Sequence, residues 1–97
     1  MDIREFQRLM REIYGENDRD RGLAGTQLWF FEEVGELAEA MRKADRAATA
    51  HEMADVLAWL ASLANMLDVD LEAACLAKYP LKCPRCDANP CRCQRQP

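Results

Sequence analysis

The sequence predicts an all-α fold, because both its composition and the spacing of its apolar residues favour helices. The helix-forming residues Ala, Leu, Glu, Arg and Met are abundant, whereas the β-branched residues Val, Ile and Thr are scarce. Apolar residues recur three or four positions apart along most of the first 67 residues, which is the period of an amphipathic helix. We expect an antiparallel helical hairpin as the core, forming a four-helix-bundle-type assembly, and a short Cys-rich C-terminal tail.

The first helix is predicted to run from about Ile3 to Tyr14. Asp2 and Glu5 have the spacing of a capping box, in which two side chains satisfy free N–H groups at a helix start. Gly15 is expected to end the helix. The apolar residues of this stretch follow one another at helical spacing: Ile3, Phe6, Leu9, Met10 and Ile13.

The next segment, residues 16–25, is polar and contains two glycines, so we interpret it as a mobile loop. It is either a solvated connection or a lid over a bound ligand. In the second case, Arg19 or Arg21 would help to neutralise a triphosphate.

A second helix is predicted from about Thr26 to Ala44. Its apolar and acidic residues fall on opposite sides, with Glu33 at the border between them. Gly35 lies among the carboxylates, although a glycine inside a helix costs about 1 kcal/mol relative to alanine. Its presence indicates close approach by another backbone or by a ligand. The predicted apolar face consists of Phe30, Phe31, Val34, Leu37, Ala38 and Met41.

A third helix is predicted from Thr49 or Ala50 to about Leu67. Thr49 and Glu52 have capping-box spacing, which gives Glu52 a structural role besides any functional one. Trp59 is expected either in a dimer interface or as a wall for a nucleobase. The predicted core stripe is Met53, Val56, Leu57, Leu60, Leu63, Ala64 and Leu67. A second edge carries Asp55, Trp59, Ser62 and Met66.

A turn is expected at residues 68–70, followed by a short fourth helix over Leu71–Lys78. Asp70 is positioned to cap that helix, and Pro80 is expected to end it. Cys75 falls inside the helix and is predicted to be a small, buried apolar residue.

Two short acidic patches lie on the second and third predicted helices. Glu33 and Glu36 are three residues apart, as are Glu52 and Asp55, so each pair projects from one helix face. Two such pairs on antiparallel neighbours can converge into a set of hard oxygen ligands, which suit Mg²⁺ or Mn²⁺. For the second helix alone, a solvated acidic edge would explain the pattern, and for Glu52 on the third helix a role as a cap partner would explain it.

These patches, E-x-x-E and E-x-x-D, resemble the signature of the MazG-like all-α nucleoside triphosphate pyrophosphohydrolases. The resemblance extends over EEVGELAEAMRK and HEMADVLAWLASLANMLDVDLEAACLAKYP, from about Gly25 to Pro80. It implies hydrolysis of a (d)NTP to a (d)NMP and pyrophosphate, with Mg²⁺ or Mn²⁺ as the cofactor. It also implies that protomers pair into a homodimer or a homotetramer.

The resemblance assigns roles to individual residues of this chain. The metal-binding positions match Glu33, Glu36, Glu52 and Asp55. Glu32 matches the carboxylate that positions or deprotonates the attacking water. Glu39 has a similar spacing to these carboxylates, and the alternative is that it is simply a surface residue. The signature does not fix the substrate contacts, for which the candidates are Lys43 and Lys78 for phosphate and Trp29, Trp59 and Asn65 for the base.

The tail spells C-x₂-C-x₄-C-x-C, with Cys83, Cys86, Cys91 and Cys93. Four thiolates in so short a loop can satisfy a tetrahedral Zn²⁺, and a site closed by four cysteines is structural. The alternatives are a disordered thiol-rich tail and redox-active disulfides. We therefore predict a MazG-like domain over residues 1–80 and a Cys-rich tail, with a zinc-binding loop, over residues 81–97.

Charge and hydropathy exclude several classes of partner. The net charge is −4, and the tail from Pro80 onward holds four basic residues against one Asp, so the helical body carries about −7. We therefore expect no nucleic acid as a partner. The longest apolar stretch is too short to span a bilayer, and no apolar run follows the start, so we expect a cytoplasmic protein without membrane contact.

Three functions fit these observations. The first is a general NTP pyrophosphatase, and the second is a member of the same superfamily with a narrower substrate such as dUTP, dCTP or phosphoribosyl-ATP. The third is a non-catalytic helical interaction module with a zinc tail. The sequence has no phosphate-binding glycine-rich loop and no Ser-His-Asp set, so P-loop and nucleophilic chemistry are unsupported.

Overall fold

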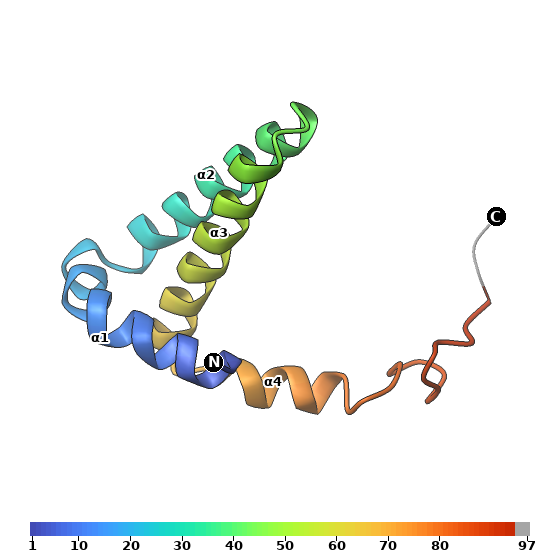
Figure 1. The fold of residues 1–97 in the computed structure, drawn as a ribbon. Helices are drawn as coiled ribbons and strands as arrows, with labels where there is room; N and C mark the ends of the chain where they lie inside the picture. Colours follow the sequence, from blue (N-terminus) through green and yellow to red (C-terminus); the bar gives the residue numbers. More distant parts are fainter. Residues whose placement is uncertain (95–97) are drawn as a thin grey trace.

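The computed structural model describes residues 1–94 and confirms the all-α fold. Within this part of the chain, four helices follow one another without a strand: α1 (Ile3–Arg21), α2 (Leu23–Arg42), α3 (Arg46–Met66) and α4 (Leu71–Lys78). A three-residue connection reverses the chain between α2 and α3, so these two helices form an antiparallel hairpin (Figure 1). Helix α1 crosses the open end of the hairpin, and α4 leads away from it toward the tail (Figure 1).

Helix α1 is longer than the sequence predicts, and the expectation of a mobile loop over residues 16–25 was wrong. Gly15 lies inside the helix, and the helix ends at Gly22, which has φ 86° and donates its N–H to the Asp18 carbonyl at 2.9 Å. A backbone with positive φ favours glycine. The last turn is held further by an ion pair of 2.9 Å between Arg21 and the buried Asp18. A single residue therefore connects α1 to α2.

Helix α3 begins earlier than predicted because a different residue caps it. The side chain of Asp45 accepts a hydrogen bond of 3.0 Å from the Ala48 N–H, which makes Asp45 the N-cap. The Thr49 hydroxyl instead donates to the Asp45 carbonyl at 2.7 Å. Since the helix start lies at Arg46, Glu52 is not needed for capping and is available to the acidic site.

Two other predicted caps are confirmed. Asp2 accepts from the Glu5 N–H at 2.8 Å, and Asp70 accepts from the Ala73 N–H at 3.0 Å. The predicted bounds of the fourth helix are those of α4.

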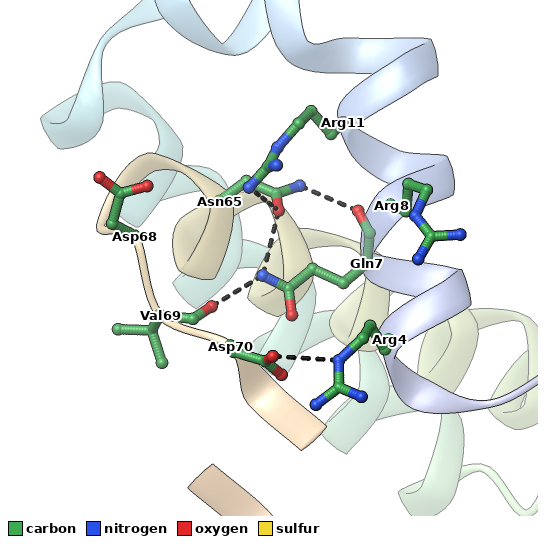
Figure 2. A pocket seen from close by; sticks show the side chains of 8 residues that line it. All are labelled: Arg4, Gln7, Arg8, Arg11, Asn65, Asp68, Val69 and Asp70. Atoms are coloured by element: carbon green, nitrogen blue, oxygen red, sulfur yellow. Dashed lines mark hydrogen bonds and ion pairs between the residues drawn. The ribbon is translucent and has the colours of Figure 1, made fainter. Parts of the chain in front are cut away.

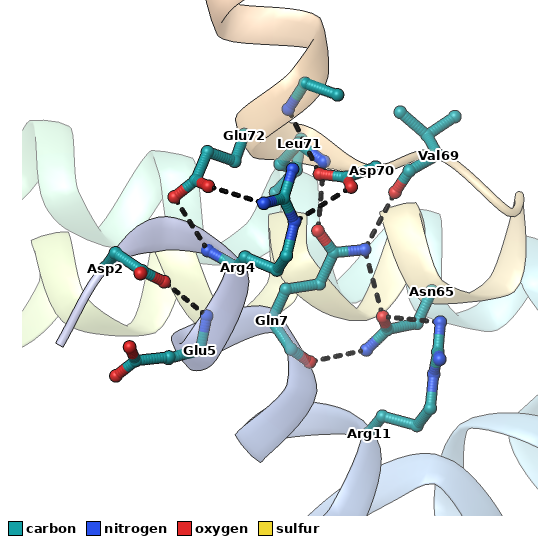
Figure 3. Close-up of polar contacts among 11 residues, drawn as sticks. Asp2, Arg4, Glu5, Gln7, Arg11, Asn65, Val69, Asp70, Leu71 and Glu72 are labelled. Carbon is teal, nitrogen blue, oxygen red and sulfur yellow. Dashed lines mark hydrogen bonds and ion pairs between the residues drawn. The ribbon is translucent and has the colours of Figure 1, made fainter.

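A buried glutamine ties α1 to the turn between α3 and α4. The Gln7 amide donates to the Asn65 side chain at 3.1 Å and to the Val69 carbonyl at 2.7 Å, and it accepts from the Leu71 N–H at 3.0 Å (Figure 3). Asn65 in turn donates to the Gln7 carbonyl at 3.0 Å and accepts from Arg11 at 3.2 Å. This network therefore sets where α1 lies across the hairpin.

Beside this network lies a surface pocket of about 300 Å³ (Figure 2). Its lining residues come from α1 and from the α3–α4 turn. One of its three arginines, Arg4, is neutralised by Asp70 at 3.0 Å and by Glu72 at 2.9 Å. The pocket is separate from the two acidic patches, because it contains none of their residues: it is lined by Arg4, Gln7, Arg8, Arg11, Asn65, Asp68, Val69 and Asp70.

Replacing Gln7 by Ala is expected to destabilise the fold by about 1–3 kcal/mol, because it leaves buried donors and acceptors without partners. The measurement is the free energy of unfolding in urea. Gln27→Ala, at an exposed position of α2, is the matched control and should shift stability by less than about 0.5 kcal/mol. Equal effects of the two substitutions would contradict a structural role for the Gln7 network.

The isolated chain buries little apolar surface. Its accessible area is 7481 Å², against about 5,700 Å² expected for a globular protein of 11.1 kDa. Its radius of gyration is 16.0 Å, against about 13 Å for a compact domain of this length. The buried apolar residues of the described chain are Met10, Ala40, Ala61 and Ala64.

The predicted core stripe of the third helix is only partly buried in a single chain, where Ala64 is 4% exposed and Val56 and Leu63 are half-buried. Met53, Leu57 and Leu67 are each about half exposed, whereas Ser62 on the predicted second edge is 3% exposed. The reason is that α1 and α2 contact α3 along that second edge and leave its most apolar face open. Cys75 is also exposed and not buried as predicted, since the main packing of α4 is against α1. None of the described helices is long and apolar enough to cross a membrane.

Candidate metal centre

The acidic patches meet in the seam between α2 and α3. Glu33 and Glu36 from α2 and Glu52 from α3 each place a carboxylate oxygen within 4.8 Å of the others. Glu52 also belongs to a second group of the same size with His51 and Asp55. All four predicted carboxylates therefore lie in two adjoining groups that share Glu52, and their role as metal ligands stays a prediction.

Two carboxylate oxygens in the seam lack partners. Glu33 Oε2 and Glu52 Oε2 are buried and accept no hydrogen bond from residues 1–94. Burial, followed by the adjacent Glu52 carboxyl and the negative charges of Glu36, Asp55 and Glu52, raises the pKa of Glu33 from 4.5 to about 7. A divalent cation would satisfy both oxygens and offset the repulsion, so the donor set fits a hard cation such as Mg²⁺.

The raised pKa of Glu33 predicts how the cation-free protein responds to pH. Because the folded-state pKa is about 7 and the ordinary value 4.5, the stability from this proton is complete below about pH 4.5 and is lost as the pH rises through about 7. Glu33→Gln keeps position 33 neutral at every pH, so the seam gains no charge there as the pH rises. In EDTA at about pH 8, this variant is expected to melt at least about 4 °C above the wild type.

The control for this experiment is Glu12→Gln, which removes an exposed carboxylate from α1. Its melting temperature should follow the wild type at every pH. If Glu33→Gln lost stability with rising pH as steeply as the wild type, ionisation of Glu33 would not be the cause of the pH dependence.

Two tryptophans stack one helical turn from the seam. Trp29 precedes Glu33 by four residues, Trp59 follows Asp55 by four, and the ring centroids lie 6.0 Å apart with an interplanar angle of 8°. Trp29 is 46% exposed. Of the two predicted base-contacting rings, Trp29 therefore has the more accessible surface.

Helix α1 contributes Arg21 to this neighbourhood. From the sequence, Arg21 was a candidate triphosphate contact of a lid, but its position in a helix against Trp59 was not predicted. The Arg21 guanidinium lies 4.8 Å from the Trp59 ring centroid, as a cation–π contact. Asp18 at 2.9 Å and the fully buried Thr26 at 3.2 Å hold it in place. Asp18 Oδ2 is the third buried side-chain oxygen without a hydrogen-bond partner in the described chain. The one feature of the sequence that could have indicated this contact is Gly22, because the turn at this glycine brings the end of α1 close to the start of α2.

The structure places the other predicted residues away from the shared seam. Lys43 pairs with Glu39 at 3.1 Å at the end of α2, and Lys78 lies 5.5 Å from the Tyr79 ring at the end of α4. Asn65 is occupied by the Gln7 network. These contacts favour structural roles, and substrate contact by the three stays an untested prediction.

Glu32 and Gly35 both lie on exposed sides of α2. Glu32 is exposed next to the seam, so water can reach its carboxylate. Apart from Gly35 itself, its two chain neighbours and the local backbone of α2, no atom of the described chain comes within 4 Å of a Cβ built on this glycine. The close approach that this glycine indicates is therefore not made within one chain.

The four tail cysteines also come together. Their sulfur atoms lie within 4.8 Å of one another, and Cys75 is not among them. Backbone N–H groups of Cys86 and Arg85 lower the pKa of the Cys83 thiol to about 6. The neighbouring sulfurs of Cys91, Cys83 and Cys86 raise the pKa of Cys93 to about 12.

Fold and site together define an all-α protein with a carboxylate seam between antiparallel helices. The chain matches the model of the MazG nucleotide pyrophosphohydrolase domain over residues 22–86, which include both acidic patches. The chain belongs to this family. A comparison with curated protein sequences gives no match. The matched residues begin at Gly22, directly before α2, and end at Cys86, so α1 lies before them.

Proposed function

We propose that the protein is a Mg²⁺-dependent nucleoside triphosphate pyrophosphohydrolase that converts a (d)NTP to a (d)NMP and pyrophosphate. The observation that carries the proposal is the pair of buried, unpartnered oxygens of Glu33 and Glu52 inside the matched family domain. A seam of like charges costs stability unless a cation binds there. Its presence in a nucleotide pyrophosphohydrolase domain is explained by that cation.

The proposed roles follow from position. Glu33, Glu36, Glu52 and Asp55 would hold the cation from both helices. Magnesium, when bound there, supplies the positive charge that attracts triphosphate oxygens and offsets the charge developing on them. His51, with its Nε2 3.4 Å from Asp55 Oδ2, orients that carboxylate.

Glu32 is the proposed general base. It is exposed beside the seam, positions the attacking water and accepts its proton as the water oxygen bonds to the α-phosphorus. The bond from that phosphorus to the bridging oxygen breaks, and pyrophosphate leaves. Trp29 is the proposed stacking surface for the base, with Arg21 and Trp59 supporting it from behind.

We also propose that the active form is at least a homodimer. The isolated chain exposes apolar residues along both hairpin helices, and no other helix of residues 1–94 covers them. The excess area of about 1,800 Å² over a globular protein of equal mass exceeds the roughly 800 Å² that each partner buries in a standard interface. The exposed residues include Phe31, Val34 and Met41 on α2 and Met53, Leu57 and Leu60 on α3.

The experiment that tests the proposed function is product analysis with a panel of nucleotides and Mg²⁺. The panel contains the common NTPs and dNTPs, dUTP, dCTP and phosphoribosyl-ATP. The expected result is equimolar monophosphate and pyrophosphate, abolished by EDTA. Turnover confined to one of the last three would favour a narrow-substrate enzyme. Diphosphate and inorganic phosphate as products, or no turnover of any nucleotide, would contradict the proposal.

A further inference from the structure

The Cys-rich tail has a defined loop although it has no apolar core. From Tyr79 to Gln94 no residue is buried, and Leu81 is 81% exposed. Yet the backbone folds back on itself: the Cys83 N–H donates to the Ala88 carbonyl at 3.0 Å, and the Asp87 N–H donates to the Cys83 carbonyl at 2.8 Å. Since apolar burial does not stabilise this loop, its order requires another source.

The sulfur positions in the loop match those of metal ligands. The Cys83 and Cys93 sulfurs lie 3.7 Å apart, and those of Cys86 and Cys91 lie 3.9 Å apart. Four sulfurs at about 2.3 Å from a tetrahedral Zn²⁺ are about 3.8 Å from one another. A disulfide would instead bring two sulfurs to about 2.05 Å. The spacing therefore favours a four-thiolate metal site over paired disulfides.

Backbone donors point at the sulfurs from the second half of the loop. The Arg92 N–H lies 3.2 Å from the Cys86 sulfur, and the Cys93 N–H lies 3.4 Å from the Cys91 sulfur. N–H groups stabilise sulfur in its negatively charged form, which is the form that binds metal. The described tail has three basic side chains, Lys82, Arg85 and Arg92. Lys82 pairs with Asp87 at 3.1 Å, so these side chains do not neutralise four thiolates.

We infer that Cys83, Cys86, Cys91 and Cys93 bind one Zn²⁺ through four thiolates, in a closed structural site that folds the tail. The four thiol protons pass to the solvent when the metal binds. Sulfur ligands select a softer ion than the oxygen ligands of the α2–α3 seam do, so the protein has two metal sites of different chemistry. Because four protein ligands complete the tetrahedron, no position is left for substrate or water.

The test uses the full chain, purified under reducing conditions without chelator, and measures bound metal by elemental analysis. We expect about one zinc per chain, with replacement by Co²⁺ giving the absorption spectrum of a tetrahedral four-thiolate site. Cys83→Ser/Cys86→Ser should lose the metal, and Cys91→Ser/Cys93→Ser should do the same. Cys75→Ser, which alters the one cysteine outside the cluster, should keep it.

A second readout reports on folding of the tail. Trypsin should cut after Lys82, Arg85 and Arg92 slowly in the zinc-loaded protein and rapidly after zinc removal. Mg²⁺-dependent hydrolysis should persist in both double-cysteine variants, so failure of this inference is distinguishable from failure of the proposed function. Protein that carries no stoichiometric metal, carries iron instead of zinc, or keeps its zinc in both double variants would overturn the inference.

Discussion

Replacing Glu36 or Asp55 by the neutral amide is expected to lower Mg²⁺-dependent pyrophosphate release by at least about 100-fold, the upper end of what loss of a group supporting a metal ligand costs. Glu36 belongs to the cluster with Glu33 and Glu52, and Asp55 belongs to the adjoining cluster with His51 and Glu52. Each of the two substitutions removes one negative charge from its cluster. The shape of the side chain is kept, so the helices should form as before. The measurement is the rate of pyrophosphate release at saturating Mg²⁺, together with the far-ultraviolet circular dichroism of each variant.

Glu12→Gln is the control for that experiment, because it removes an equal charge from an exposed position on α1. It should retain the wild-type rate within about twofold. Near wild-type rates in both Glu36→Gln and Asp55→Asn would remove these residues from the site. A loss in Asp55→Asn alone would confine the cation to the group formed by His51, Glu52 and Asp55.

A second large effect is expected at the exposed apolar face of the hairpin. Leu57 and Leu60 are 45% and 38% exposed in the isolated chain, and both are expected to be buried in the dimer. Leu57→Asp/Leu60→Asp would place two charges in an apolar interface, which costs several kcal/mol unless the subunits separate. The variant should therefore become monomeric and lose helicity.

Light scattering at micromolar concentration measures this effect directly. The wild type should have the mass of a dimer or a tetramer, and the double variant that of one chain. Leu81→Asp, at an 81% exposed tail residue, is the control and should leave the mass unchanged. A monomeric wild type would contradict the proposed assembly.

The sequence predicted helices well where a local signal marks their ends, and poorly where two signals compete. Asp2 and Asp70 cap the helices they were expected to cap. Two glycines compete for the end of α1, and Gly22 prevails because the chain turns there with positive φ. Gly15 needs no unusual backbone and is tolerated inside the helix. Composition alone does not distinguish these two cases.

The same limit applies to the packing of α3. Periodicity identifies its most apolar face, but it does not say whether the same chain or another one covers that face. In this chain α1 and α2 pack against the less apolar edge of α3, which carries Trp59 and Ser62. The apolar stripe around Leu57 stays open. This arrangement is explained if a second subunit covers the apolar stripe.

The candidate site was predictable in its carboxylates but not in its surroundings. The three-residue spacing placed Glu33 with Glu36 and Glu52 with Asp55, and the structure brings the pairs together. The contribution of Arg21 depends on a contact between α1 and α3, far apart in the sequence. Such tertiary contacts leave no periodic trace in a single sequence.

The most direct test of the proposed cation site is a Mn²⁺ titration of the full chain, followed by electron paramagnetic resonance and with Mg²⁺ as competitor. The wild type should bind Mn²⁺ saturably and release it to Mg²⁺, and the zinc-free Cys83→Ser/Cys86→Ser variant should do the same. Glu52→Gln/Asp55→Asn should lose this binding while keeping its helicity. Equal Mn²⁺ binding by the wild type and the Glu52→Gln/Asp55→Asn variant would contradict the assignment of the α2–α3 seam as the cation site.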